Sequence, residues 1–349
     1  MFYKVVGLMS GTSLDGLDMA YCEFEKQQEG WKFSIVKAET ATYSDKLRRQ
    51  IISAETMSGR ELALFDVQLG AFFGQLARDF IDRNGLSPDF VCSHGQTIFH
   101  QPNKGYTLQI GNLAALCSKV RLTTIGDFRT MDVALGGQGA PLVPIGDLLL
   151  FKDYEDCLNI GGFSNISHKQ NGNITSYDIC PVNIVLNYLC QKIGLTFDDG
   201  GKIAQSNPID EKLLSQLDAL PYYKDLKSGN SLGKEWVEEN IFPILENSSI
   251  SVKEQIATYT LHAAKQISRN IKGRTLATGG GAYNDYLMKL IRQNTTFAIE
   301  IAERTITDFK EAMIFAFLGV LRVRNEANCL QSVTGASRSC CSGTILQWI

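Results

Sequence analysis

The sequence predicts a mixed α/β protein with two domains. Strand-like apolar runs alternate along the chain with amphipathic segments of helical periodicity. The order strand, strand, strand, helix, strand, helix occurs once in each half, and a turn of small residues follows the first strand each time. The length of 349 residues also exceeds the size at which one hydrophobic core usually stops growing. We therefore expect two domains that repeat one topology without visible sequence identity.

The first half opens with strands and continues with helices. Apolar runs predict strands at residues 5–9, 17–24 and 33–42. Apolar side chains at helical spacing then predict two helices within residues 45–84. Shorter elements follow, namely strands at 90–92, 108–111 and 123–126 and a helix at 112–118. Residues 131–144 contain several glycines and prolines and are expected to form a linker or an active-site loop.

The second half repeats this pattern. Strands are predicted at residues 156–160, 174–179, 274–278 and 296–301. Helices are predicted at residues 183–192, through most of 200–272, at 285–293 and at 309–324. Glycine-bearing turns follow strands at positions 11, 161 and 279. Because ligands of open α/β sheets collect at the carboxyl ends of strands, these turns are candidate phosphate or nucleoside contacts.

Composition and charge exclude several classes of function. Hydrophobic residues make up 44% of the chain and charged residues 20%, as in folded globular proteins. A net charge of −3 gives no electrostatic reason to expect a nucleic-acid or membrane partner. The sequence shows no run of about 18 apolar residues and no signal peptide, and its nine cysteines include no CxxC pair. We expect a cytoplasmic protein whose reduced cysteines mostly fill the core, and we assign no role to the adjacent Cys340 and Cys341.

Several common catalytic and cofactor motifs are absent from the sequence. It contains no GxxxxGK(S/T) P-loop, no GxGxxG dinucleotide fingerprint, no HExxH zinc motif and no GxSxG nucleophile elbow. No cluster of cysteine and histidine has the spacing of a zinc site. Of the four histidines only His94 has a suggestive setting, and we expect His100, His168 and His262 at the surface or paired in the core.

The turn after the first strand is the strongest candidate for a phosphate site. Gly11 and Gly16 permit backbone conformations in which amide N–H groups converge, and the two hydroxyl side chains after Gly11 add donors. Asp15 and Asp18 would repel a bare phosphate, but they suit a phosphate that arrives with Mg²⁺. The alternative is an ordinary β-hairpin with a polar turn, although such turns usually need only about two to five residues.

Asp127 is the best candidate for a catalytic group. It follows the strand predicted at 123–126, so its carboxylate is expected at the carboxyl end of that strand, where a general base can activate a hydroxyl or water. Asp132 and the glycine-rich segment 136–141 follow closely, which indicates close approach of backbone to a ligand. The alternatives for Asp127 are a helix cap and an ion pair with Arg129.

Three further segments are weaker candidates. Residues 93–97 suit a polyhydroxylated or acetamido ligand, and a satisfied polar turn explains them nearly as well. Glu311, at the N-terminal end of the last predicted helix, is either a ligand contact or a favourable charge on the helix dipole. The glycines 279–281 before a helix fit a nucleoside face or a phosphate, with a tight turn as the alternative. Together with the hairpin and Asp127, these segments favour phosphoryl transfer.

Six segments make the chain resemble a known family. In chain order they read MSGTSLDGLD, SHGQT, GDFRTMDVALGGQGAPLVP, NIGGFSNI, TGGGAYN and SVTGA, and the resemblance spans residues 7–336. They resemble the motifs of the anhydro-N-acetylmuramic acid kinases. The resemblance implies the two-domain sugar kinase/Hsp70/actin fold, which is ribonuclease H-like, with a ligand cleft between the lobes. It implies an N-terminal lobe of residues 1–130 plus 312–349 and a C-terminal lobe of residues 131–311, with each boundary placed to within 15 residues.

The resemblance also implies an activity. Members of this family use ATP and Mg²⁺ to open 1,6-anhydro-N-acetylmuramic acid with water and to phosphorylate O6, which yields N-acetylmuramic acid 6-phosphate and ADP. The step belongs to peptidoglycan recycling and amino-sugar metabolism in the cytoplasm, and members are typically homodimers. We therefore expect ATP, Mg²⁺ and a small sugar as ligands, no nucleic-acid or membrane partner, and a homodimer.

Matched residue by residue, the resemblance implies specific roles. Asp127 would be the general base that activates the attacking water, and Asp15 would hold Mg²⁺ through water. Four residues would contact the sugar, namely His94, Thr97, Arg129 and Glu311. The nucleotide contacts would be Gly11, Thr12, Ser13, Leu14, Asp15, Gly16, Leu17, Asp18, Gly161, Gly162, Asn165, Gly279, Gly280 and Gly281.

The chain departs from the family pattern at one segment. Where the family has approximately Asp-Thr-Gly-Pro-Gly-Asn, this chain has Asp178-Ile-Cys-Pro-Val-Asn183, so two glycines are lost and a different nucleotide affinity is expected. Gly126 also replaces an alanine, which is a mild change. Two other functions stay open: a kinase of the same fold for another sugar, and a nucleotide-gated binding protein, which would need no base at position 127.

Overall fold

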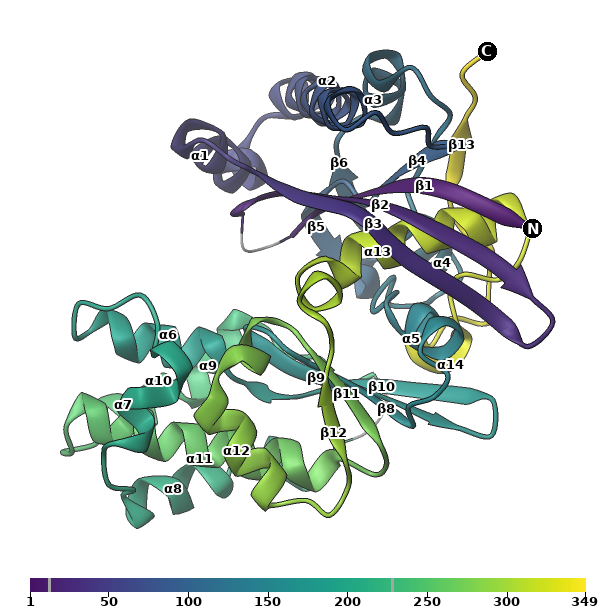
Figure 1. The fold of residues 1–349 in the computed structure, drawn as a ribbon. Coiled ribbons are helices and arrows are strands. Elements are labelled where there is room, and N and C mark those ends of the chain that lie inside the picture. Colours follow the sequence, from purple (N-terminus) through teal and green to yellow (C-terminus); the bar gives the residue numbers. More distant parts are fainter. Residues whose placement is uncertain (12–13, 227–228) are drawn as a thin grey trace. The chain divides into compact units, whose positions relative to one another are not determined.

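The two larger sheets of the protein share one order of five strands. The structure is a computed structural model that describes residues 1–11, 14–226 and 229–349. The chain forms two units, one of residues Met1–Leu150 with Phe309–Ile349 (unit 1) and one of residues Phe151–Asp308 (unit 2). Figure 1 shows that each unit combines a sheet with packed helices.

Unit 1 is built on a six-stranded sheet of order β13-β7-β4-β1-β2-β3. Strands β1 (Phe2–Ser10), β2 (Gly16–Gln27) and β3 (Gly30–Thr42) are antiparallel neighbours. Strand β4 (Phe90–Ser93) runs parallel to β1, and β7 (Thr124–Gly126) runs parallel to β4. The last strand, β13 (Thr344–Leu346), is antiparallel to β7. A separate two-stranded sheet pairs β5 (Gln96–Gln101) with β6 (Tyr106–Ile110).

Unit 2 has a five-stranded sheet of order β10-β9-β8-β11-β12. Strands β8 (Asp156–Ile160), β9 (Phe163–Gln170) and β10 (Asn173–Pro181) are antiparallel neighbours. Strand β11 (Thr275–Thr278) runs parallel to β8, and β12 (Ile299–Ile301) runs parallel to β11. This order and these directions match β3-β2-β1-β4-β7 of unit 1. The predicted repeat, and with it the ribonuclease H-like two-domain fold, is confirmed.

Helices connect and cover the strands of each unit (Figure 1). Those of unit 1 are α1 (Asp45–Ser53), α2 (Gly59–Arg83), α3 (Leu113–Val120), α4 (Thr130–Ala134), α5 (Pro144–Leu150) and α14 (Gln331–Thr334). Those of unit 2 are α6 (Asn183–Gln191), α7 (Lys202–Gln205), α8 (Glu211–Asp218), α9 (Lys234–Asn240), α10 (Phe242–Glu246), α11 (Val252–Asn270) and α12 (Asp285–Gln293). Helix α13 (Arg304–Val323) begins in unit 2 and continues into unit 1. Single 3₁₀ turns lie at Ala54–Thr56, Pro102–Lys104, Asp199–Gly201, Pro221–Lys224 and Gly280–Tyr283.

Both faces of the unit 1 sheet are buried, which explains why β1 is a continuous apolar run. Val6 and Leu8 point to one face and share a core with helices α2 and α3. The alternate residue Gly7 faces α13, where an added Cβ would lie 1.9 Å from the carbonyl oxygen of Ala312. Phe24 of β2 packs on Phe317 of α13. Because successive strand residues face opposite sides, this alternation places helices on both sides of the sheet.

Helix α2 is defined by its cap and by its contact with α3. Ser58 and Glu61 form a capping box at its first turn. Gly70 and Gly74 lie on the face toward α3, where an added Cβ would meet backbone oxygens at 2.3 Å and 2.5 Å. The absence of a side chain at these two positions therefore permits a close helix pair.

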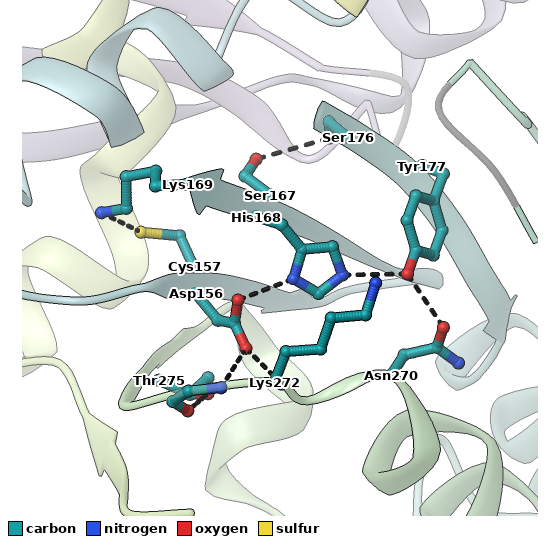
Figure 2. A network of polar contacts seen from close by, with 11 residues as sticks. Asp156, Cys157, Ser167, His168, Lys169, Ser176, Tyr177, Asn270, Lys272 and Thr275 are labelled. Carbon is teal, nitrogen blue, oxygen red and sulfur yellow. Dashed lines mark hydrogen bonds and ion pairs between the residues drawn. The ribbon is translucent and has the colours of Figure 1, made fainter. Parts of the chain in front are cut away.

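A buried polar network lies in unit 2 (Figure 2). Nδ1 of His168 lies 2.6 Å from Oδ1 of Asp156, and Nε2 lies 2.9 Å from the hydroxyl of Tyr177. The Tyr177 hydroxyl donates to Oδ1 of Asn270 at 2.9 Å, and the second Asp156 oxygen accepts from the backbone N–H groups of Lys272 and Gly273. The network joins β8, β9, β10 and α11, and it shows that His168 is a paired core histidine, as predicted.

The other two histidines also match the prediction. His262 is buried and pairs with Asp218, while His100 is exposed. All nine cysteines are free thiols, and seven of them are buried. In the described part of the chain, no helix combines the length and apolar character that crossing a membrane requires.

The structure differs from the sequence-based expectations in several elements. Strands β5, β9 and β13 were not expected, and α13 begins at Arg304 rather than at residue 309. Glu311 therefore lies well inside the helix, and the helix-dipole interpretation of its charge is wrong. Residues 131–150 belong to unit 1, because α5 packs on β3 and Gly146 of α5 packs on Ile314 of α13. The expected linker thus contains α4 and the start of α5.

Candidate active site

The proposed base and one proposed sugar contact follow neighbouring parallel strands of unit 1. Ser93, the last residue of β4, pairs with Gly126, the last residue of β7. His94 and Asp127 come next on the two strands, so the fold brings them to one edge of the sheet. Position 126 has room only for glycine, because an added Cβ would lie 2.4 Å from the Leu113 side chain.

Arg129 is held by two hydrogen bonds. Its Nε–H donates to Nε2 of His94 at 2.9 Å, and Nη1 donates to the carbonyl of Gly139 at 2.6 Å. Among the residues that the structure describes, none accepts from Nη2, so this nitrogen keeps its donors for a ligand. Burial lowers the pKa of Arg129 to about 10, and the nearby Glu311 carboxylate opposes this. The guanidinium therefore stays charged at neutral pH.

His94 is buried and neutral. Its Nδ1 lies 2.8 Å from the carbonyl of Gly95, which can only accept, so Nδ1 carries the proton and Nε2 accepts from Arg129. Burial lowers the pKa of His94 to about 3, and the Arg129 charge adds to the effect. The imidazole therefore acts here as an acceptor that positions Arg129.

Asp127 has an unusual backbone and one restrained oxygen. Its φ is 56°, a left-handed conformation that non-glycine residues rarely adopt. Oδ1 accepts from the hydroxyl of Thr130 at 2.5 Å and from its N–H at 3.4 Å, so the helix-cap interpretation is partly right. No donor to Oδ2 and no ion pair with Arg129 occur within the described ranges. The side chain is exposed, and its second oxygen is open to a ligand.

The glycine-rich segment after Asp127 is fixed by a buried carboxylate. Asp132 accepts from the N–H of Gly139 at 2.8 Å and from the hydroxyl of Thr334 at 2.7 Å. The N–H of Gln138 donates to the carbonyl of Thr334 at 2.9 Å. An added Cβ at Gly137 would lie 2.2 Å from the Asp132 carboxylate, so only glycine fits there. Asp132 thus ties the GGQGAP segment, whose Ala140–Pro141 bond is cis, to the SVTGA segment.

Glu311 and Thr97 belong to the same unit as Arg129. Burial of the Glu311 carboxylate among protein atoms raises the pKa of Glu311, and the Arg129 guanidinium opposes part of this rise. Solvent still reaches Glu311, which limits this effect. Thr97 is half-buried in β5 and accepts from Nε2 of Gln109 at 3.2 Å.

A cavity of about 410 Å³ in unit 1 includes two of the predicted site residues. His94 and Asp127 line it, whereas Thr97, Arg129 and Glu311 do not. Polar residues that sequence reasoning missed also line it, namely Asp66, Gln109 and Asn112. Asp66 lies within an amphipathic helix, where no sequence signal marks it, and its carboxylate accepts from the N–H of Gly111 at 2.7 Å.

The hairpin between β1 and β2 is anchored at both ends. Ser10 shares a 2.6 Å hydrogen bond with the Tyr43 hydroxyl, and the N–H of Tyr43 donates to the carbonyl of Asp15. Leu14 has a φ of 58°, and its carbonyl accepts from Nε of Arg48 at 2.9 Å. Thr12 and Ser13, both predicted contacts, lie outside the described residues.

The rest of the hairpin contributes acidic and close-packed residues. Gly11 is half-buried and Asp15 is exposed, and Gly16 and Leu17 open β2 as buried residues. Asp18 accepts from the hydroxyl of Thr40 at 2.5 Å. An added Cβ at Gly16 would lie 2.5 Å from the carbonyl of Ala41, so its role includes packing. Carboxylate oxygens at positions 15 and 18 are donors that Mg²⁺ prefers, so the hairpin fits a hydrated magnesium ion.

In unit 2 the predicted glycines separate into packing and open positions. An added Cβ would lie 2.6 Å from Asn159 at Gly279 and 2.3 Å from Ile160 at Gly281. At Gly280 and Gly162 an added Cβ would meet nothing within 4 Å. Gly279 and Gly281 are therefore required by the turn after β11, whereas Gly280 leaves space for a ligand.

A second cavity, of about 390 Å³, lies beside these glycines in unit 2. Gly280 and Gly281 line it together with Asn183, the segment 198–200 and Asn284. Gly161, Gly162, Asn165 and Gly279 do not. Sequence reasoning missed the run Asp-Asp-Gly-Gly at 198–201, although two glycines after two aspartates are a loop signal.

The segment that departs from the family pattern is well packed. The Asp178 carboxylate accepts from the N–H of Leu232 at 2.8 Å, and burial raises its pKa. The N–H groups of Val182 and Asn183 donate to the carbonyls of Gly162 and Gly161 at 2.7 Å and 3.2 Å. The segment thus supports the turn between β8 and β9. Its last residue, Asn183, is the first residue of α6 and lines the unit 2 cavity.

The duplicated fold, the glycine-lined cavity of unit 2 and the polar site of unit 1 are compatible with a phosphotransferase of the sugar-kinase type. Comparison with protein families makes this specific. The model of the family "Anhydro-N-acetylmuramic acid kinase" matches residues 3–347, and the chain belongs to this family.

Curated relatives agree with the family assignment. A protein named anhydro-N-acetylmuramic acid kinase from Bacillus cereus is 31% identical over 98% of this chain and 98% of its own length. One of the same name from Synechococcus elongatus is 34% identical, over 96% of this chain and 97% of its own. The chain is therefore a kinase with an alcohol group as acceptor.

Solved structures give only distant likenesses. The activator of the 2-hydroxyisocaproyl-CoA dehydratase from Clostridium difficile with bound ADPNP is 14% identical, with a TM-score of 0.44 over 92% of this chain and 97% of that chain. A ROK family glucokinase from Streptomyces griseus in complex with glucose and AMPPNP is 10% identical, with a TM-score of 0.41 over 90% of this chain and 98% of that chain.

Proposed function

We propose that the protein uses ATP and Mg²⁺ to open 1,6-anhydro-N-acetylmuramic acid with water and to phosphorylate O6. The products are N-acetylmuramic acid 6-phosphate and ADP, and the step serves peptidoglycan recycling in the cytoplasm. The family supports the substrate class. The observation that carries the proposed chemistry is Asp127, whose left-handed backbone and Thr130 contact leave one carboxylate oxygen open at a strand end.

In the proposed reaction, Asp127 takes a proton from water as the water oxygen bonds to the anomeric carbon. The bond between that carbon and O6 breaks, and its electron pair stays on O6. O6 then bonds to the γ-phosphorus of ATP, and the bond from that phosphorus to the β–γ bridging oxygen breaks to release ADP. A magnesium ion held near Asp15 and Asp18 would offset phosphate charge.

The remaining residues bind and orient the two ligands. Arg129, positioned by His94 and Gly139, would donate from Nη2 to a sugar oxygen or carboxylate. Thr97 and Glu311 would complete the sugar contacts. The hairpin 11–18 would bind the phosphates, and the glycines 161, 162 and 279–281 with Asn165 would lie on the nucleotide side. We also propose that unit 1 carries the sugar contacts and the phosphate hairpin, that unit 2 carries the nucleotide contacts, and that the protein is a homodimer.

The test is a substrate panel with product identification. Purified protein with ATP and Mg²⁺ is given 1,6-anhydro-N-acetylmuramic acid, N-acetylmuramic acid or N-acetylglucosamine, and ADP release and the product mass are measured. We expect turnover with the anhydro sugar alone and a product heavier by one water and one phosphoryl group. Turnover with a sugar that has no anhydro bridge would show that the protein is a kinase for a different sugar. Nucleotide hydrolysis without any sugar would favour a nucleotide-gated binding protein.

A further inference from the structure

Two thiols lie close together near the end of the chain in unit 1. Cys329 and Cys340 face each other across an isolated antiparallel bridge, in which each backbone N–H donates to the carbonyl of the other residue at 3.1 Å. Pairs of this kind place their Cα atoms about 5.5 Å apart, which a disulfide can span. The two sulfurs and one Asp132 carboxylate oxygen all lie within 4.8 Å of one another.

The thiol pair contacts the segment that carries the proposed base. Sγ of Cys329, which is buried, donates to the carbonyl of Phe128 at 3.5 Å. Phe128 lies in the chain between Asp127 and Arg129. Asp132, the third member of the cluster, accepts from the N–H of Gly139, whose carbonyl accepts from Arg129. A displacement of Cys329 and Asp132 would therefore act on two groups next to Arg129. One is the carbonyl of Phe128, which precedes it in the chain, and the other is the carbonyl of Gly139, which accepts its hydrogen bond.

The two thiols differ in the way that disulfide chemistry requires. The neighbouring Cys329 thiol lowers the pKa of Cys340 and the Arg338 charge adds to this, whereas burial and the Asp132 charge oppose it. The neighbouring Cys340 sulfur and burial raise the pKa of Cys329. Cys340 is also half-buried rather than fully buried, so a small oxidant can reach it. Cys340 is thus suited to be the attacking thiolate and Cys329 the resolving thiol.

We propose that Cys329 and Cys340 form a reversible disulfide on exposure to hydrogen peroxide, and that this modification weakens sugar binding. The Cys340 thiolate bonds to one peroxide oxygen, the O–O bond breaks, and the hydroxide that leaves takes a proton and becomes water. The Cys329 sulfur then loses its proton and bonds to the Cys340 sulfur, and the S–O bond breaks to release a second water. The two thiols are oxidised, the peroxide is reduced to two waters, and a dithiol reductant restores the thiols.

The contacts favour a disulfide over a metal ion at this cluster. Only three donor residues come together there within the described part of the chain, whereas structural zinc sites use four. Both oxygens of Asp132 already accept hydrogen bonds. Bond formation between the sulfurs would remove the S–H donor from the Phe128 carbonyl and shift the segment that holds Arg129.

Peptide mapping tests the bond without reference to activity. Trypsin cleaves after Arg338, so a Cys329–Cys340 disulfide links the peptides 325–338 and 339–349. The full chain is treated with peroxide, free thiols are alkylated, and the digest is analysed by mass spectrometry with and without dithiothreitol. Peptide 339–349 also contains Cys341, so the matched variants are Cys340→Ser and Cys341→Ser. We expect the link in the wild type and in Cys341→Ser, and its absence in Cys340→Ser.

A second readout, which rests on the proposed function, is the sugar KM. Peroxide is expected to raise it about fivefold, the effect of roughly one lost hydrogen bond, with recovery in dithiothreitol and no response in Cys340→Ser. Full alkylation of Cys329 and Cys340 after peroxide would overturn the proposal, as would a link that survives in Cys340→Ser. Stoichiometric zinc that protects both thiols from alkylation while no link forms would replace it with a metal site. Linkage without any change in KM would overturn the effect on sugar binding.

Discussion

Nε of Arg129 donates to Nε2 of His94 at 2.9 Å, and this contact requires the imidazole to be neutral at that nitrogen. The other ring nitrogen is committed to the carbonyl of Gly95 at 2.8 Å. The guanidinium is therefore held by a neutral acceptor rather than by a carboxylate, and its charge is not cancelled at the point of attachment. A positive group held in this way keeps its charge available for a ligand.

The neutral state of His94 predicts a pH dependence of stability. Burial and the Arg129 charge lower the pKa of His94 from 6.5 to about 3. Between these pH values the unfolded chain binds a proton that the folded chain does not, so the free energy of unfolding falls as pH is lowered. The contribution is fully present above pH 6.5, and about 2 kcal/mol of it is lost by pH 5.

Urea denaturation at pH 7 and pH 5 measures this dependence. The variant His94→Gln has no titrating ring, yet its side-chain oxygen can still accept from Arg129, so its stability should fall less over the same interval. Burial also lowers the pKa of the more accessible His100, so His100→Gln should keep more of the wild-type pH dependence than His94→Gln does. Equal losses in the wild type and in His94→Gln would show that His94 does not carry the effect.

Gly137 predicts a steric effect on the site. An added Cβ would lie 2.2 Å from the Asp132 carboxylate, so Gly137→Ala must displace Asp132 from Gly139 and Thr334. We expect a loss of about 2 to 3 kcal/mol in the free energy of unfolding. In Gly59→Ala the new methyl meets nothing within 4 Å at the start of α2, and stability should rise by up to about 1 kcal/mol. Denaturant titration measures the free energy of unfolding of both variants. A change of the same sign in the two variants would refute the steric account.

Gly280 and Gly281 predict opposite consequences for the same substitution. Gly281→Ala brings a methyl 2.3 Å from Ile160 and should lower the melting temperature, while Gly280→Ala has open space and should leave it unchanged. If ATP approaches the backbone at Gly280, the methyl should instead weaken ATP binding about tenfold. Calorimetry with ATP and thermal unfolding separate the two effects. If folded Gly280→Ala protein bound ATP as tightly as the wild type does, the nucleotide site would not lie beside this turn.

The fold was predictable to the extent that local patterns carried it. Apolar runs marked β1, β8 and β11, and the glycine turns at positions 11, 161 and 279 marked their carboxyl ends. Strand β9 was missed because Gly161, Gly162 and Asn165 give the start of that segment the composition of a loop. Helix α5 was missed because its neighbours 136–141 are rich in glycine and its first residue is Pro144.

The site was predictable by residue type but not by contact. The position of Asp127 after a strand followed from local sequence alone. The contact between His94 and Arg129 depends on β4 and β7 being neighbours, which the order of elements along the chain does not reveal. The thiol pair is similar, because Cys329 and Cys340 meet only when the chain turns back between them. Such contacts are set by tertiary pairing and leave no local sequence signal.

The central claim is that Asp127 is the general base. Asn tolerates the left-handed φ of 56° at this position and its oxygen can still accept from Thr130, so Asp127→Asn removes the base and little else. The decisive measurement is sugar-dependent ADP release by the wild type and Asp127→Asn, with the Kd of the sugar measured for both. The account predicts a fall in kcat of about a thousandfold with a sugar Kd within about threefold of wild type. A kcat within about tenfold of wild type would contradict it.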